Sequence, residues 1–151
     1  MQRLCAASGV ALVYVPEITG CRAWDVTHWV SPEKAILQLS LRGKSDDHFW
    51  FTFFHEAAHI LLHPKKELFL EWDGERDERE KEADRFATEI LVPPAAWAPV
   101  VQARPRSARE IQAWAERLNL VPGILVGRLQ HEKMLPFAHL NGLKIKLHFA
   151  D

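Results

Sequence analysis

The fold of this chain is decided by residues 49–62, which read FWFTFFHEAAHILL. Apolar side chains would cover nearly every face of a helix formed over this stretch, so we expect that helix to lie at the centre of the core. His55 and His59 are four residues apart in it and therefore lie one turn apart on one face. Two buried imidazoles need polar partners, and a shared metal ion would satisfy both of them.

Glu56 follows the first histidine and completes the pattern His-Glu-x-x-His. In zinc hydrolases the two histidines of this pattern bind the metal and the glutamate is the general base. The pattern therefore predicts one Zn²⁺ per chain at His55 and His59, with Glu56 as the catalytic residue. A chain rich in His and Glu also matches it by chance, and two locally bonded core histidines would then suffice. His63 is rotated ~80° from His55, which favours a structural hydrogen bond over a fourth-ligand role.

A third protein ligand is expected from a separate element, because a catalytic zinc keeps three protein ligands and an open position for water. Glu80 and Asp84 are four residues apart in a second predicted helix, 75–91, and share a face. Glu80 could then bind the metal while Asp84 accepts a hydrogen bond from a ligand histidine. Glu82 points ~200° away from Glu80, so it is the alternative third ligand. A charged, solvated helix face would explain these residues without a metal.

The segments before the central helix complete an α+β fold of zincin-like architecture. Residues 2–8 can form a short helix, and the β-branched residues 10–15 predict a strand. Residues 22–41 contain two apolar runs around a turn at 31–34, which is typical of a β-hairpin. These strands predict a small, mainly antiparallel N-terminal sheet that packs on the helix with the His-Glu-x-x-His pattern.

The segments after the central helix are mainly helical. Ser107 and Glu110 match a capping box at the start of one helix. Residues 143–149 alternate apolar and polar side chains, as a half-buried strand does. The predicted elements are a polar connector over 65–79 that meets the second helix, a short helix over 94–97 limited by Pro99, a basic linker over 102–106, helices over 107–118 and 122–134, and a final strand over 143–149.

Length and composition are those of one globular domain, 1–151, with a core of about residues 10–95 and a C-terminal segment of about residues 107–149. The net charge of −1 argues against general polyanion binding, and direct nucleic-acid binding is not expected. Cys5 and Cys21 form no Cys-x-x-Cys pair, and we interpret them as reduced residues of a cytoplasmic protein. No secretory signal is visible and no apolar run reaches the ~18 residues of a membrane span, so no membrane contact is expected.

Two blocks of the sequence resemble the ImmA/IrrE-type zinc metallopeptidases. The first is FTFFHEAAHILLH over 51–63, and the second is EKEADRFATEILVP over 80–93. The second is similar to that family's Glu-x-x-Ala-Asn/Asp-x-Phe-Ala stretch, which ends in a proline. The tail over 122–130, PGILVGRLQ, is similar to the tails of members linked to toxin–antitoxin systems. The resemblance covers about residues 10–95.

This resemblance implies a zinc-dependent endopeptidase that cleaves a specific protein, either a helix-turn-helix transcriptional repressor or a toxin–antitoxin regulator. Zinc would polarise the scissile carbonyl, and Glu56 would pass a proton from the attacking water to the leaving amine. A donor for the developing oxyanion is then expected. His139, His28 and Tyr14 are candidates for it, and the sequence does not choose among them.

Two other functions remain open. The segment 102–133 has the spacing of a helix-turn-helix and an excess of basic residues, so it could bind DNA or a toxin partner. That function requires Arg117 and Arg128 to be exposed on one continuous face. Alternatively, the chain is a zinc-stabilised, non-proteolytic antitoxin or regulatory binding protein, and a Glu56→Gln variant separates that function from proteolysis.

Overall fold

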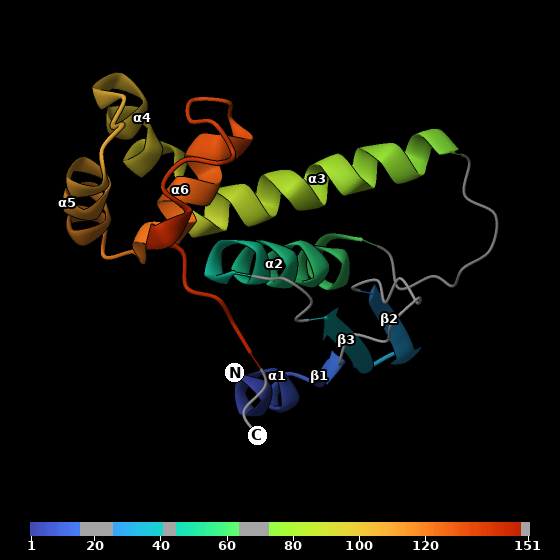
Figure 1. Cartoon of the computed structure of the whole chain (residues 1–151). Helices are drawn as coiled ribbons and strands as arrows, with labels where there is room; N and C mark the ends of the chain where they lie inside the picture. Colours follow the sequence, from blue (N-terminus) through green and yellow to red (C-terminus); the bar gives the residue numbers. More distant parts are fainter. Residues whose placement is uncertain (16–25, 41–44, 64–72, 149–151) are drawn as a thin grey trace. The chain divides into compact units, whose positions relative to one another are not determined.

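The computed structural model describes residues 1–15, 26–40, 45–63 and 73–148 of the chain (Figure 1). Its internal contacts divide the chain into two compact units. The first unit comprises Met1–Arg42 and Thr52–Ala87, and the second comprises Gly43–Phe51 and Thr88–Asp151. Two long helices contribute to both units, since each is divided near one of its ends. Our prediction of a single domain stays a prediction.

The first unit contains a three-stranded sheet. A short helix, α1 (Gln2–Ala7), precedes β1 (Val10–Val15), and β2 (Val26–Ser31) and β3 (Lys34–Ser40) follow. Within the described residues the strand order is β1-β3-β2, with β2 antiparallel and β1 parallel to β3. The predicted hairpin is therefore confirmed from residue 26 to residue 40, and residues 22–25 and 41 lie outside the described ranges.

The sheet is mixed, whereas we expected it to be mainly antiparallel. The hairpin places β2 on one edge of β3, so β1 takes the other edge and runs in the same direction as β3. β3 is the central strand because its apolar residues are the most deeply buried: Ala35, Leu37 and Leu39 are almost inaccessible to solvent. The α+β class itself is confirmed, with the two histidines of the motif on a helix.

One face of the sheet packs on that helix, α2 (Asp46–Leu62). Leu12 and Thr27 are both in register with Leu37 and therefore share its face, because side chains alternate along a strand. The hydroxyl of Thr27 donates a hydrogen bond of 3.2 Å to the carbonyl oxygen of Glu56. The sheet is thus joined to the turn of α2 that carries the motif.

The second long helix, α3 (Asp73–Leu91), begins earlier than we expected. We predicted the helix over 75–91 and a connector over 65–79, and the backbone is helical from residue 73 onward, two residues before the predicted start. Charged side chains one turn apart can stabilise such a helix, as Lys81 and Glu78 do with a 3.0 Å ion pair. Residues 64–72 of the predicted connector lie outside the described ranges.

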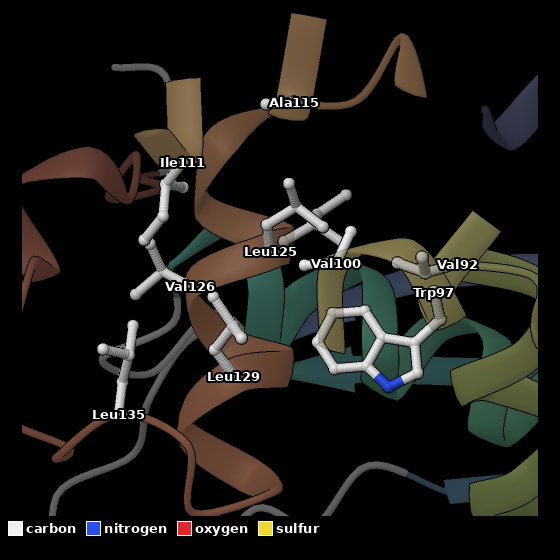
Figure 2. Packing of buried hydrophobic residues seen from close by; sticks show 10 residues of the cluster. Val92, Trp97, Val100, Ile111, Ala115, Leu125, Val126, Leu129 and Leu135 are labelled. Carbon is white, nitrogen blue, oxygen red and sulfur yellow. The ribbon is translucent and has the colours of Figure 1, made fainter. Parts of the chain in front are cut away.

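The core of the second unit is formed largely by three helices, α4 (Pro94–Ala103), α5 (Ala108–Leu118) and α6 (Pro122–His131). Figure 2 shows their side chains converging on one another. The buried cluster comprises Val92, Trp97, Val100, Ile111, Ala115, Ile124, Leu125, Val126, Leu129 and Leu135. This cluster is separate from the apolar face of the sheet, which belongs to the first unit.

Helix α4 continues through Pro99, which we expected to end it. A proline inside a helix removes one hydrogen bond, but Trp97 and Val100 on either side of it are buried in the core and hold the helix to Ala103. Arg104 then ends it in the left-handed conformation, with φ of 47°. The predicted basic linker over 102–106 is consequently reduced to the residues after Ala103.

The predicted capping box of α5 is confirmed, since the Ser107 hydroxyl and the Glu110 carboxylate each accept from the other residue's backbone N–H. The predicted strand over 143–149 is wrong for its described part. Residues 141–143 form a short 3₁₀ helix, η1 (Asn141–Leu143), and only an isolated bridge joins Lys146 to Ser45. The alternating segment meets the start of α2 here, and a helix terminus offers capping groups but no strand edge.

Candidate metal centre

Helices α2 and α3 bring together three of the residues that the sequence predicted as metal ligands. Nε2 of His55 lies 3.1 Å from Nε2 of His59 and 3.2 Å from Oε2 of Glu80. Nε2 of His59 lies 3.8 Å from Oε1 of Glu80. Among the described residues these three form the group of His, Cys, Asp and Glu side chains that could hold a metal ion.

The separations fit a single metal ion. Ligand atoms that sit ~2.0–2.1 Å from a tetrahedral zinc lie about 3.3–3.4 Å from one another. The two histidine nitrogens are 3.1 Å apart, and the two oxygens of the Glu80 carboxylate lie 3.2 Å from His55 and 3.8 Å from His59, so all three side chains can reach one position. Two nitrogens and one carboxylate oxygen are also a donor set typical of a catalytic zinc site, which leaves a fourth position open.

Asp84 lies behind the first histidine. Its Oδ1 is 2.9 Å from Nδ1 of His55, so a proton on Nδ1 can be donated to the carboxylate while Nε2 keeps its lone pair for the metal. Glu80, one turn earlier on α3, faces both histidines. Glu80 and Asp84 thus both lie at the histidines, as their spacing predicted, and their roles as ligand and hydrogen-bond acceptor stay a prediction.

Glu82, the alternative third ligand, contacts a different histidine. Its Oε2 lies 3.4 Å from Nε2 of His63, and its Oε1 lies 3.9 Å from a guanidinium nitrogen of Arg85. The helix period separates Glu82 from Glu80 correctly but says nothing of which side chain of α2 each one meets. This contact was not predicted from the sequence, although a further histidine one turn beyond His59 was the signal for it.

The environment of His59 favours its neutral form. Burial lowers the pKa of His59; the Glu80 carboxylate opposes this effect, and His55, His63 and Arg79 reinforce it. A neutral imidazole retains a lone pair, which is the form that binds a metal. His59 is thus held in the form that could bind a metal.

Glu56 is buried at 8% exposure, in the turn of α2 between the two ligand histidines. Helix geometry rotates it ~100° from His55 and ~60° from His59, so it lies beside the face that they form. Its backbone is held by the hydrogen bond from Thr27. A glutamate next to the open side of the metal position suits a general base.

The three candidate oxyanion donors lie in three different settings. Tyr14 is half-buried in β1, in register with Leu39, and burial raises its pKa, with Cys5 adding to the effect. His28 is exposed on the opposite face of the sheet, since it alternates with Thr27. His139 is exposed and belongs to the second unit. Of the three, only Tyr14 shares the sheet face that packs on α2.

The helix-turn-helix interpretation of the C-terminal segment required two arginines on one exposed face. Arg128 does not meet this requirement, because its side chain is only 13% exposed. Its guanidinium group donates hydrogen bonds to the carbonyl oxygens of Thr88 and Val92 at 2.9 and 2.8 Å. Arg117 is exposed and lies over the ring of Trp114. Gly123, Ile124, Leu125, Val126, Leu129 and Gln130 of α6 are buried.

Comparison with known proteins gives one finding on the family. A sequence model of the Peptidase_M78 family, described as the IrrE N-terminal-like domain, matches residues 22–130. A search of curated proteins finds no significant match. In the described part of the chain, every helix is too short or too polar to cross a membrane.

Proposed function

The chain belongs to the Peptidase_M78 family of IrrE N-terminal-like domains, and from this premise we propose that it is a zinc-dependent endopeptidase. The family supports a metallopeptidase type of function. The observation that carries the proposal is the convergence of His55, His59 and Glu80 on one position, with Glu56 buried beside them. Zinc is the proposed metal because two imidazoles and one carboxylate are a donor set typical of catalytic zinc sites.

The chain's own residues perform the proton transfers. Zinc, when bound, supplies a Lewis acid that polarises the scissile carbonyl and acidifies a water molecule. Glu56 accepts the proton of that water as it attacks and then donates it to the leaving amine. Asp84 holds the ring of His55 with Nε2 toward the metal position. The Tyr14 hydroxyl is the preferred oxyanion donor of the three candidates, because it shares the sheet face that packs on α2.

The proposed substrate is a specific protein in the cytoplasm. The resemblance of the two motif blocks to ImmA/IrrE-type enzymes supports a helix-turn-helix repressor as the substrate. The tail over 122–130 supports a toxin–antitoxin regulator instead. The buried position of Arg128 argues that the chain meets such a partner as a protein and does not itself bind DNA.

Metal analysis tests the site. The wild-type protein is expected to carry about one zinc per chain, and His59→Ala and Glu80→Ala are expected to lose most of it. A Glu80→Ala protein that retains its zinc would transfer the ligand role to Glu82. A carefully prepared wild type without zinc would contradict the proposal.

A matched variant tests the chemistry. Glu56→Gln keeps the size and burial of the side chain but cannot accept the proton, so it is expected to bind zinc normally and lose proteolysis. Cleavage of candidate repressors and toxin–antitoxin regulators, co-expressed with each protein, is the measurement. If Glu56→Gln retains full function in the cell, the chain acts instead as a zinc-stabilised, non-proteolytic antitoxin or regulatory binding protein.

A further inference from the structure

The proposed mechanism does not use His63, the residue that directly follows α2. His63 lies one turn beyond His59, and its side chain is 7% exposed. Its Nδ1 is 2.8 Å from Nδ1 of His59, whereas Nε2 of His59 faces His55 and Glu80. The two rings are thus in contact through the nitrogens that the metal site does not need.

The placement of protons follows from the chemistry of imidazole. A neutral ring carries one N–H and one lone pair, on different nitrogens. If Nε2 of His59 binds a metal, the proton of the His59 ring is on Nδ1, and among the described residues its acceptor is Nδ1 of His63. His63 must then accept at Nδ1 and carry its own proton on Nε2.

The proton on Nε2 of His63 needs an acceptor, and a carboxylate lies close to it. Nε2 of His63 is buried and has no hydrogen bond among the described residues. Among the described residues, the acid in contact with it is Glu82, whose Oε2 lies 3.4 Å away but without hydrogen-bond geometry. Because an unsatisfied buried N–H is costly, closing this small gap is the favourable way to satisfy it.

The structure assigns His63 as the positioning residue of His59, backed in turn by Glu82. The order of contacts is metal position, His59, His63, Glu82, and it fixes both the tautomer and the ring orientation of the second ligand. The inference rests on the proposed function, since it requires a metal at Nε2 of His59.

The two ligand histidines are accordingly held in different ways. His55 donates directly to the carboxylate of Asp84, whose side chain is about half exposed. His59 is held through a second, buried imidazole. The contact through His63 explains why α3 presents Glu80 and Glu82 to α2, although only one of them can bind the metal.

Zinc affinity of the full chain, measured by competition with a chromogenic chelator, tests the assignment. His63→Phe keeps a ring of similar size but offers no acceptor, and it is expected to bind zinc about 10- to 100-fold more weakly. His63→Gln offers a carbonyl oxygen to Nδ1 of His59, and it is expected to restore affinity to within about 3-fold of wild type. Unfolding of the metal-free proteins is measured in parallel, and a merely structural role would not separate Phe from Gln in zinc affinity.

A second pair of variants does not disturb the interior. Glu82→Ala removes the outer carboxylate and is expected to weaken zinc binding measurably, but by less than about 10-fold. Glu78→Ala is the control, because Glu78 is exposed on the same helix and pairs with Lys81. Equal affinities for these two proteins would exclude Glu82 from the contact order, whether or not His63→Phe folds.

The outcomes also separate this inference from the proposed function. A wild type that binds no zinc would overturn both. Tight zinc binding by wild type together with equal binding by His63→Phe would overturn the role of His63 alone. Weak binding by both His63→Phe and His63→Gln would show that the acceptor is not what His63 provides, and the assignment would fall.

Discussion

The two ends of α2 carry two clusters of polar side chains that are built in opposite ways. Near its C-terminal end, His55 and His59 face Glu80, whose side chain is 47% exposed. At its N-terminal end, Asp46 and Asp47 are buried at 4% and 6% exposure. The first, which we call the open cluster, has donor atoms that converge on a position for a metal. The second, which we call the closed cluster, is paired with groups of the protein itself.

The N-terminal cluster is a network within the second unit. The ammonium group of Lys144 lies 2.7 Å from Oδ2 of Asp47 and donates a 2.8 Å hydrogen bond to Gln130. The amide of Gln130 in turn donates to the carbonyl oxygens of Phe137 and His139. The C-terminal segment is thus tied to α6 and to the first turn of α2.

The network depends on the close approach of α6 to the first turn of α2. Gly123 and Gly127 lie one turn apart on α6, and an added Cβ at either position would overlap the carboxylate of Asp46 or Asp47. Glycine is therefore required at these positions for steric reasons. The contrast with the metal centre is that buried polar groups with protein partners maintain the fold, while donor atoms that converge on a shared position are available for chemistry.

The largest expected effect is a loss of stability when the closed cluster loses its cation. Lys144→Met keeps an unbranched chain but leaves the buried carboxylate of Asp47 without its cation, which typically costs about 3–5 kcal/mol. Urea unfolding of the metal-free protein measures the loss. Lys146→Met, two residues away and exposed, is the control and should change stability by less than about 0.5 kcal/mol. Equal effects of the two substitutions would contradict the distinction between the clusters.

The second effect concerns the open cluster. Zinc that binds only the folded protein should stabilise it by about 2.7 kcal/mol at a free concentration 100 times its Kd. His59→Ala should abolish this gain, yet the metal-free variant should unfold within about 1 kcal/mol of wild type, because the His59 side chain is not fully buried, at 23% exposure. Thermal unfolding with zinc and with a chelator gives both values. A large loss in the metal-free variant would make the site a structural element of the fold.

A third effect tests whether Arg128 is structural. Its guanidinium group caps the end of α3 through Thr88 and Val92, pairs with Glu132 and lies 4.5 Å from the ring centroid of Trp97. Lysine lacks the fork that makes these contacts together, so Arg128→Lys should cost about 2 kcal/mol.

The matched variant for this test is Arg117→Lys. Arg117 is an exposed arginine that stacks on Trp114 and makes no such set of hydrogen bonds. Its replacement should change stability by less than about 0.5 kcal/mol. If Arg128→Lys changes the free energy of unfolding as little as Arg117→Lys does in denaturant titrations, Arg128 is not a structural residue. Its burial then no longer argues against a DNA-binding helix-turn-helix.

The sequence predicted the part of the site that depends on helix period. His55, His59 and Glu56 are related by positions within one helix, and Glu80 and Asp84 by positions within another, so α-helical geometry alone predicts which of them share a face. The contact of Glu82 with His63 depends on how the two helices pack, and a single-helix period carries no such information.

Two errors in the predicted fold have the same origin. Alternation over 143–149 predicted a strand, but a strand also needs a partner edge, and this segment meets a helix N-terminus through Asp46 and Ile145 instead. Pro99 predicted a helix end, but burial of its neighbours decided otherwise. In each case tertiary packing overrode a local rule that was itself correct.

The smallest expected effect is a change in how the free energy of unfolding depends on pH, and it comes from Asp46 of the closed cluster. Burial is the largest cause that raises the pKa of Asp46 above its ordinary value of 3.8. Hydrogen bonds from the backbone N–H groups of Ile145 and Asp47 oppose that effect, and the neighbouring Asp47 charge adds to it. Its Oδ2 is buried without a partner among the described residues. The folded protein therefore holds this proton more tightly than the unfolded chain does.

The sign of the pH effect follows from this difference in proton binding. Stability contributed by protonated Asp46 is present at low pH and is lost as the pH rises through the window above 3.8. Asp46→Asn keeps an oxygen acceptor and never ionises, so its stability relative to wild type should improve across that window and then level off. Urea unfolding of both proteins between about pH 3 and pH 7 measures the difference. A difference that stays constant with pH would mean that the buried carboxyl is no more costly to ionise in the folded protein, and the closed cluster would then tolerate charge as readily as the open one.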